Sequence, residues 1–203
     1  MRVLIVYCHP DDDSTTKHLC DTFIEGLVSS GIDYEISDLY SMDFKSDMSL
    51  SEYRREAYYN DSADIPADVA AEQEKINRAD GIVFIYPVFW TEAPSKLVGW
   101  FQRVWTYGFA YGKDRSMKVL ERAMFIVSMG GDLDDPVRCT QAEAMRVVML
   151  EDRIADRAKR KDMVFFDKTS HMFIESDDYD DRIIDYTQKA FVLGRRFFDK
   201  RRI

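Results

Sequence analysis

The chain has 203 residues, which is enough for a full hydrophobic core, and its hydrophobic fraction of 46% is ordinary for a globular protein. Acidic residues spread along the sequence give a formal net charge of −9 without any basic stripe, so nucleic acid and anionic membranes are poor candidate partners. The three cysteines lack CxxC spacing, which argues against a disulfide framework, and no apolar run is long enough to span a bilayer. We therefore expect a soluble cytoplasmic protein.

Strand and helix patterns alternate along the chain. The first run, residues 3–7, is continuously apolar, as expected of a strand buried on both faces. Ser14 or Thr15 can cap the helix that follows, which stops at Gly31. Further strands are predicted at 33–39, 81–86, 123–128 and 163–166, and further helices at 68–79, around the apolar positions 97–105, at about 135–160 and around the apolar positions 183–198. This alternation predicts an α/β sandwich with a mostly parallel sheet.

Residues 40–66 interrupt the alternation. The segment is rich in Ser, Asp, Tyr and Met and is too long for a simple connection. Segments of this kind usually cover a functional site or contact a partner. No repeat, low-complexity tract or linker points to a second domain, so we expect residues 1–203 to form one domain with an insertion at about 40–66.

The segment between the third strand and the next helix is the most informative part of the sequence. Pro87 cannot donate to a strand ladder and Pro94 suits the first turn of a helix, so the junction is fixed from both sides. We expect the backbone N–H groups of residues 88–92 to face a ligand, with Phe89 and Trp90 offering aromatic surface. A flat, hydrogen-bonding ring such as a flavin would suit this loop, and an aromatic turn in the core is the alternative.

Ligands of open parallel sheets bind beyond the carboxyl ends of the strands. Three loops with unusual sequences lie at such ends, residues 8–16, 87–91 and 128–132, and we expect them to share one site. In the last of these loops, Gly130 and Gly131 would let a flat ring approach the backbone closely, or would simply form a turn. The G-x-G-x-x-G fingerprint and the P-loop are absent, which disfavours a Rossmann dehydrogenase.

The first of the three loops carries polar residues that suit a phosphate. Ser and Thr hydroxyls at positions 14–16 stand at a helix N-terminus, whose free N–H groups and dipole attract anions, although ordinary helix capping explains them as well. The three aspartates at 11–13 oppose an anion there unless their side chains point to water. Lys17 or His9 would compensate for them.

With these residues assembled, the sequence resembles the flavodoxin-like NAD(P)H:quinone oxidoreductases, the DT-diaphorase-like family. The resemblance rests on Pro-x-x-Trp at 87–90, Gly-Trp-Phe-x-Arg-Val at 99–104 and Phe-Ala-Tyr at 109–111, in this order and spacing. It covers about the first two thirds of the chain and fades after Asp132.

The resemblance implies a flavodoxin-like three-layer sandwich with a five-stranded parallel sheet of order 2-1-3-4-5. It implies FMN or FAD as cofactor, NAD(P)H as electron donor, no metal, and a homodimer to which the insertion contributes. The residues implied to bind the cofactor are His9, Ser14, Thr15 and Thr16 at its phosphate and ribityl chain, Pro87, Val88, Phe89, Trp90 and Thr91 at its ring, and Ser128, Met129, Gly130 and Gly131 along the pyrimidine edge. Tyr111, with Phe109 nearby, is implied to line the substrate pocket at the dimer interface, and Tyr111 is the candidate catalytic residue.

The sequence departs from the family pattern at two places. Thr15 and Thr16 stand where the family often has Phe-Asn, on the adenine side of FAD. Mammalian members carry a tyrosine and a histidine after Gly-Gly that relay a proton to the quinone, and residues 132–137 contain neither. A proton would then come from solvent or from Tyr111.

The function that we predict is reduction of quinones or similar small acceptors by NAD(P)H through ping-pong hydride transfer on a bound flavin. A flavin- or nucleotide-binding regulatory subunit of a transport system is an alternative. A second alternative is a magnesium-dependent phosphatase, because Asp11 and Asp13 fit D-x-D-x-T after the first strand. The sequence leaves open FMN or FAD, NADH or NADPH, and a quinone, azo or nitro acceptor.

Overall fold

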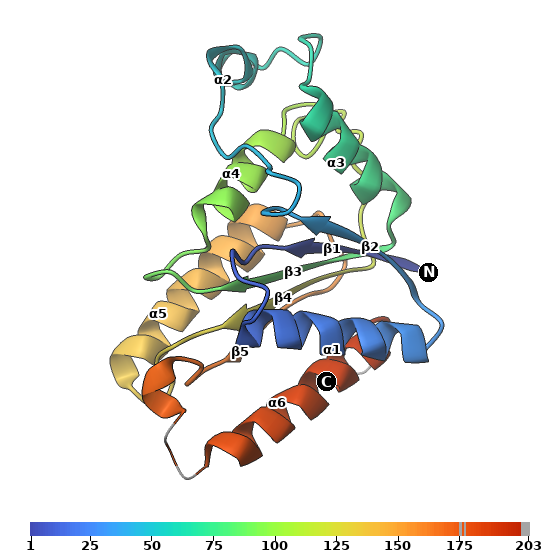
Figure 1. Ribbon diagram of the computed structural model, residues 1–203. Helices are drawn as coiled ribbons and strands as arrows, with labels where there is room; N and C mark the ends of the chain where they lie inside the picture. Colours follow the sequence, from blue (N-terminus) through green and yellow to red (C-terminus); the bar gives the residue numbers. More distant parts are fainter. Residues whose placement is uncertain (175, 177, 200–203) are drawn as a thin grey trace.

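The structure is a computed structural model that describes residues 1–174, 176 and 178–199. Its centre is a five-stranded sheet of β1 (Arg2–Tyr7), β2 (Asp33–Asp38), β3 (Gly81–Pro87), β4 (Arg122–Ser128) and β5 (Lys161–Phe166). All neighbouring strands are parallel and their order is β2-β1-β3-β4-β5 (Figure 1). The predicted fold class is thereby confirmed.

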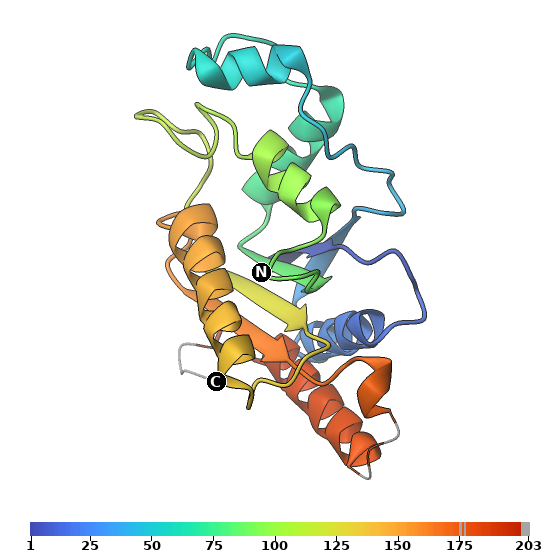
Figure 2. The same cartoon turned by 90° about the vertical axis from the view of Figure 1, so that its left-hand side faces the viewer.

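Helices cover both faces of the sheet. α1 (Thr15–Ser29) and α6 (Tyr179–Arg195) lie on one face, and α3 (Ala67–Arg78), α4 (Ser95–Val104) and α5 (Pro136–Arg146) lie on the other (Figures 1 and 2). The side chains of β1 alternate between the two cores, because successive residues of a strand point to opposite faces. Val3 and Ile5 pack toward α1 and α6, whereas Leu4 and Val6 pack toward the other three helices.

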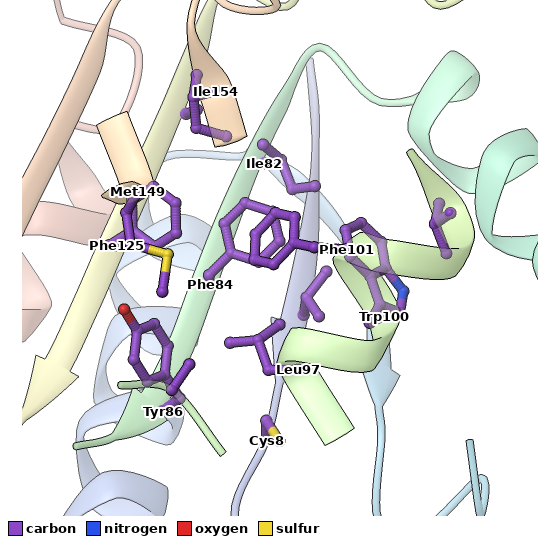
Figure 3. Packing of buried hydrophobic residues seen from close by; sticks show 14 of the residues in the cluster. Cys8, Ile82, Phe84, Tyr86, Leu97, Trp100, Phe101, Phe125, Met149 and Ile154 are labelled. Atoms are coloured by element: carbon purple, nitrogen blue, oxygen red, sulfur yellow. The ribbon is translucent and has the colours of Figure 1, made fainter. Parts of the chain in front are cut away.

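Aromatic side chains fill the core on the face of α3, α4 and α5. Phe84 of β3 lies at its centre, with ring centroids 4.8 Å from Phe101, 4.9 Å from Phe125 and 5.6 Å from Trp100 (Figure 3). Offset and edge-to-face arrangements of this kind add stability beyond the area that they bury. This core therefore holds β3, the strand that precedes the central loop of the site, firmly in place.

On the other face, α1 and α6 touch through their backbones. A Cβ atom built on Gly26 would lie 2.2 Å from the carbonyl oxygen of Phe191, and one built on Gly194 would lie 2.0 Å from that of Phe23. Only glycine permits so close an approach. α6 thus supports the helix whose N-terminus faces the predicted phosphate site.

The segment 40–66 contains one short helix, α2 (Leu50–Ala57), which lies beyond α4 and away from the sheet (Figure 1). It begins with a capping box between Ser49 and Glu52. Buried Arg103 of α4 anchors the segment, because its Nε donates to Glu52 Oε1 at 2.7 Å and its Nη1 donates to Asp68 Oδ2 at 2.6 Å.

Two predicted helix ends were wrong. The helix expected to reach residue 160 changes after Arg146 into the π-helical segment η1 (Val147–Ile154), and Ala155 then adopts a φ of 47°. The chain leaves the helix because residues 157–159 pair instead with Leu120 through two backbone hydrogen bonds of 2.9 and 2.8 Å. The last helix ends at Arg195, so residues 197 and 198 lie beyond it, although both still pack against the core.

Within the described residues, none of the helices has the length and apolar character that crossing a membrane requires.

Candidate cofactor site at the carboxyl edge of the sheet

A cavity of about 500 Å³ opens at the carboxyl ends of β1, β3 and β4. This volume is in the range of small-molecule and cofactor sites. The three predicted loops meet there, and a fourth segment between β5 and α6 completes the wall. The lining residues are His9, Asp11, Asp13, Ser14, Thr15, Thr16, His18, Pro87, Val88, Ser128, Gly130, Thr169, His171, Ile174, Tyr179 and Ile183.

The first wall is the N-terminus of α1. Ser14 caps the helix, since its Oγ accepts the N–H of Lys17 at 3.1 Å. Thr15 and Thr16 are the first two residues of the helix, whose N–H groups have no partner within a helix. The Thr16 hydroxyl lies 2.7 Å from that of Ser128 at the end of β4, and this buried hydrogen bond joins the first wall to the third. The helix therefore offers free donors and the positive end of its dipole to an anion.

Asp11 and Asp13 of the first loop line the cavity together with His9. Its Nδ1 lies 3.0 Å from the backbone nitrogen of Asp11, which donates to it, and the Oδ1 of Asp11 accepts the N–H of Asp13 at 2.9 Å. Lys17 pairs with Asp21 at 2.6 Å and is not in the cavity wall. Of the two predicted compensating residues, the structure thus places only His9 at the cavity, beside two carboxylates.

The second wall is the turn that follows β3. Val88 N–H donates to Ser128 O at 2.8 Å, and the turn is closed by Phe89 N–H to Glu92 O at 2.9 Å and Glu92 N–H to Phe89 O at 3.2 Å. The prediction that all N–H groups of residues 88–92 are free was therefore wrong. Within this turn, only the N–H groups of Trp90 and Thr91 lack a hydrogen-bond acceptor among the residues that the structure describes.

The side chains of this turn are open to solvent. The Trp90 side chain is 95% exposed and its φ is 60°, and Phe89 is also exposed. The alternative of an aromatic turn packed in the core is thereby contradicted. Pro87 and Val88 line the cavity, whereas Phe89, Trp90 and Thr91, which follow them in the turn, are not among the lining residues.

The third wall follows β4. Ser128 and Gly130 line the cavity, whereas the side chain of Met129 is buried in the core and its N–H donates to Phe166 O at 2.8 Å. Gly131 lies just outside the lining. Among the residues described, nothing accepts a hydrogen bond from the N–H groups of Gly130 and Gly131. The backbone here presents two more donors at the cavity.

The fourth wall, formed by residues 169–174 and 179–183, is missing from the sequence prediction. Ser170 packs against Gly130, because a Cβ on this glycine would lie 3.1 Å from the Cβ of Ser170. The Ser170 hydroxyl is buried and makes no hydrogen bond to any residue that the structure describes. His171 follows it in the lining, so all three histidines of the chain, His9, His18 and His171, face one cavity. The rule that ligands bind past strand ends could have pointed to this segment, since it follows β5.

Tyr111 and Phe109 lie apart from this cavity. The Tyr111 hydroxyl donates to Glu56 Oε2 of α2 at 2.7 Å, and the same oxygen accepts the N–H of Tyr107 at 2.9 Å. Burial and the neighbouring Glu56 carboxylate raise the pKa of Tyr111. Phe109 is buried and lines a smaller cavity of about 260 Å³ with Gln73 and Ser116.

No group of three or more His, Cys, Asp or Glu side chains in the described ranges is arranged to hold a metal ion. Asp11 uses one carboxylate oxygen to accept from the backbone of Asp13, within the loop itself. Nothing in this arrangement favours the phosphatase alternative.

Comparison with known proteins agrees with this geometry. The sequence model of the flavodoxin-like fold family matches residues 1–151. The chain is 33% identical over 157 residues to a ribosyldihydronicotinamide dehydrogenase-like protein of Penicillium crustosum, covering 64% of this chain and 58% of that protein. It is 32% identical over 123 residues to NAD(P)H dehydrogenase (quinone) 1 of Rattus norvegicus, covering 54% of this chain and 45% of that protein. The chain thus spans about half the length of the curated relatives that it matches.

One solved structure is similar over the whole chain. The NAD(P)H:quinone oxidoreductase from Methanothermobacter marburgensis is 36% identical, with a TM-score of 0.89, and the match covers 100% of this chain and 99% of that one. The family match, this structural similarity and the topology of the sheet agree with one another. The chain belongs to the flavodoxin-like family of the NAD(P)H:quinone oxidoreductases.

Proposed function

We propose that this protein is a flavin-dependent NAD(P)H oxidoreductase that reduces quinones or similar small acceptors. The observation that carries the proposal is the cavity in which a helix N-terminus and two loops with unpartnered N–H groups meet at the carboxyl edge of the sheet. The names of the relatives, a quinone oxidoreductase and a quinone dehydrogenase, support the same chemistry.

The residues present fit a flavin nucleotide. The N–H groups of Thr15 and Thr16 and the side chain of His9 would hold its phosphate at the end of α1. The free N–H groups of Trp90 and Thr91 and those after β4 would donate to the oxygens and nitrogens of the ring. FMN and FAD share this part of the molecule, so the same residues serve both.

A bound flavin would supply the redox chemistry, taking a hydride from NAD(P)H and passing it to an acceptor that occupies the same place afterwards, which makes the kinetics ping-pong. The protein binds and orients the ring through the turn after β3. Fixed N–H dipoles in the turn and after β4 stabilise negative charge on the ring, as in an oxyanion hole. The exposed Trp90 indole offers an apolar surface beside the ring.

We further propose that the acceptor pocket is completed in a homodimer. Tyr111 and Phe109 do not line the cavity of their own chain, so a role at the acceptor requires a second copy to bring them to it. The helix α2 supports this proposal because it exposes apolar side chains, with Leu50 63% and Tyr53 60% exposed. Sedimentation velocity measures the expected dimer, and a protein that stays monomeric at all concentrations contradicts it.

The absorbance spectrum of the purified protein tests the proposed function. A yellow protein whose released cofactor is FMN or FAD, and which oxidises NADH or NADPH with a quinone present, is the expected result. A flavin without turnover would identify the regulatory alternative. A colourless protein that gains no flavin absorbance on incubation with FMN or FAD would refute the proposal.

A further inference from the structure

The turn after β3 holds a strained backbone at the position where the ring is proposed to bind. Trp90 has a φ of 60°, a conformation that is uncommon for residues other than glycine. The paired hydrogen bonds between Phe89 and Glu92 close the turn around it. Such strain persists only where surrounding structure fixes the conformation, and it gathers at ligand sites.

Glu92 is the residue that connects this turn to the rest of the molecule. Its Oε1 accepts the N–H of Ala93 at 2.8 Å, which fixes the carboxylate over the start of α4. Its Oε2 lies 3.6 Å from Nη2 of Arg153. The backbone of Glu92 closes the turn while its side chain reaches toward a cation from a distant segment.

Arg153 reaches Glu92 from η1, 61 positions further along the chain. Its side chain is only 14% exposed, and its guanidinium lies 4.9 Å from the centre of the Phe101 ring. Its carbonyl oxygen accepts the indole N–H of Trp105 at 2.6 Å, which holds its backbone in place. π-helical segments are rare in proteins, and those that occur are often found at functional sites.

Glu92 is the carboxylate that faces the Arg153 guanidinium. The Nη1 atom is buried without a hydrogen-bond partner in the described ranges, and Glu92 is the one carboxylate paired with the side chain there. The nearby hydroxyl of Tyr86, on the same side of the sheet as Phe101 (Figure 3), is buried and unpartnered as well. The Arg153 side chain is nearly buried whereas that of Glu92 is 47% exposed, so solvent screens the pair in part, and loss of Glu92 would leave Arg153 without a facing carboxylate among the described residues.

We propose that Arg153 is a positioning residue which, through Glu92, holds the turn in the conformation that presents the N–H groups of Trp90 and Thr91 to the flavin. The inference rests on the proposed function for the identity of the ligand. The positioning itself is a property of the protein without cofactor.

The test compares five variants as apoprotein, four single substitutions and the double variant of Arg153→Met with Glu92→Gln. Arg153→Met keeps the length and apolar contacts of the side chain and removes its charge, and Arg153→Lys restores the charge without the planar fork. Glu92→Gln keeps an oxygen for the N–H of Ala93. Arg146→Met is the matched control, because Arg146 lies in the preceding turns of the same helix and also covers an aromatic ring, Phe165 at 5.0 Å, away from the site.

Two quantities are measured for each variant. Titration with FMN and FAD gives the dissociation constant of the flavin. We expect Arg153→Met and Glu92→Gln each to raise it about tenfold, and the double variant to raise it no further. Arg153→Lys should give a dissociation constant between those of the wild type and Arg153→Met. Amide hydrogen exchange gives the protection of Glu92 N–H, which we expect to fall in Arg153→Met while the core strands stay protected. A general loss of stability would instead reduce protection throughout.

The outcomes separate this inference from the proposed function. If the wild-type protein binds no flavin, the proposed function fails, and the exchange of Glu92 still decides whether Arg153 holds the turn. If Arg153→Met keeps wild-type protection at Glu92, the positioning role is overturned. The same holds if Arg146→Met weakens flavin binding as much as Arg153→Met does.

Discussion

The hydroxyl groups of Thr16 and Ser128 lie 2.7 Å apart in the floor of the cavity, although 112 positions separate them in the sequence. Thr16 belongs to the first turn of α1 and Ser128 ends β4, so the hydrogen bond fixes the first wall of the cavity relative to the third. Both side chains are almost fully buried, so each hydroxyl depends largely on the other for a hydrogen bond.

This pair predicts a measurable coupling. Thr16→Val or Ser128→Ala alone leaves a buried hydroxyl without its partner and should cost about 1–3 kcal/mol in the free energy of unfolding. The double variant should cost less than the sum of the two, because no orphaned group remains. Urea unfolding of all four proteins measures the coupling, and strictly additive losses would show that the hydroxyls do not interact.

The close contact between α1 and α6 predicts that one added methyl group at Gly194 strongly lowers the free energy of unfolding. Gly194→Ala places a Cβ 2.0 Å from the carbonyl oxygen of Phe23, so the helices must separate. We expect the free energy of unfolding to fall by about 3 kcal/mol or more, because the clash outweighs the small gain in stability that alanine gives over glycine in a helix interior. Thermal unfolding measures it, with Gln188→Ala on the exposed side of α6 as control. Unchanged stability in Gly194→Ala would mean that the helices are further apart.

The Arg103 network predicts acid sensitivity. The hydrogen bond from Arg103 lowers the pKa of Asp68, and burial opposes it only in part. For Glu52 burial raises the pKa, but hydrogen bonds from Ser49 and Arg103 outweigh it and the pKa is lowered. Both carboxylates bind protons more weakly when folded, so their contribution is complete above the unfolded values of about 4 and is lost as pH falls through the folded ones.

We therefore expect the urea midpoint to fall between about pH 5 and about pH 3, and to fall less in Arg103→Met. At neutral pH, Arg103→Met should itself cost about 3 kcal/mol, because it leaves partly buried carboxylates unpaired. Arg115→Met is the control, since its partner Asp156 is exposed and such a pair contributes little. Equal pH dependence in wild type and Arg103→Met would refute this account.

The cysteines predict a simple pattern of reactivity. Burial raises the pKa of Cys8 to about 12 and that of Cys20 to about 12, whereas Cys139 is exposed. Because the thiolate is the reactive form, a thiol reagent should modify one cysteine in the native protein and three in denaturant. Cys139→Ser should abolish the native reaction. Rapid native modification of Cys8 would show that the end of β1, beside the cavity, opens.

Most of the fold could be predicted from the sequence because the three central strands are buried on both faces. Continuous apolar runs identified β1, β3, β4 and β5 to within two residues, whereas the edge strand β2 is largely exposed and carries no such run, and the alternation of elements indicated the parallel sheet. The end of η1 could not be found in this way. Residues 155–160 still look helical locally, and only their pairing with Leu120, a tertiary contact, takes them out of the helix.

The site could be predicted in part. The rule that parallel strands end at one edge correctly brought together the loops that contain Ser14, Pro87 and Gly130. Which N–H groups stay free could not be predicted, because this depends on the hydrogen bonds of one tight turn. The contact between Arg153 and Glu92 could not be predicted either, because the two segments that it joins meet only in the folded chain.

The fourth cavity wall, formed by residues 169–174 and 179–183, lies outside the region, residues 1–151, that the family model matches. The first three walls lie within the matched region, and the fourth lies beyond it. In this protein the fourth wall brings His171 and Tyr179 to the cavity that His9 and His18 also line, so the shape and polarity of that side of the cavity depend on residues outside the matched region.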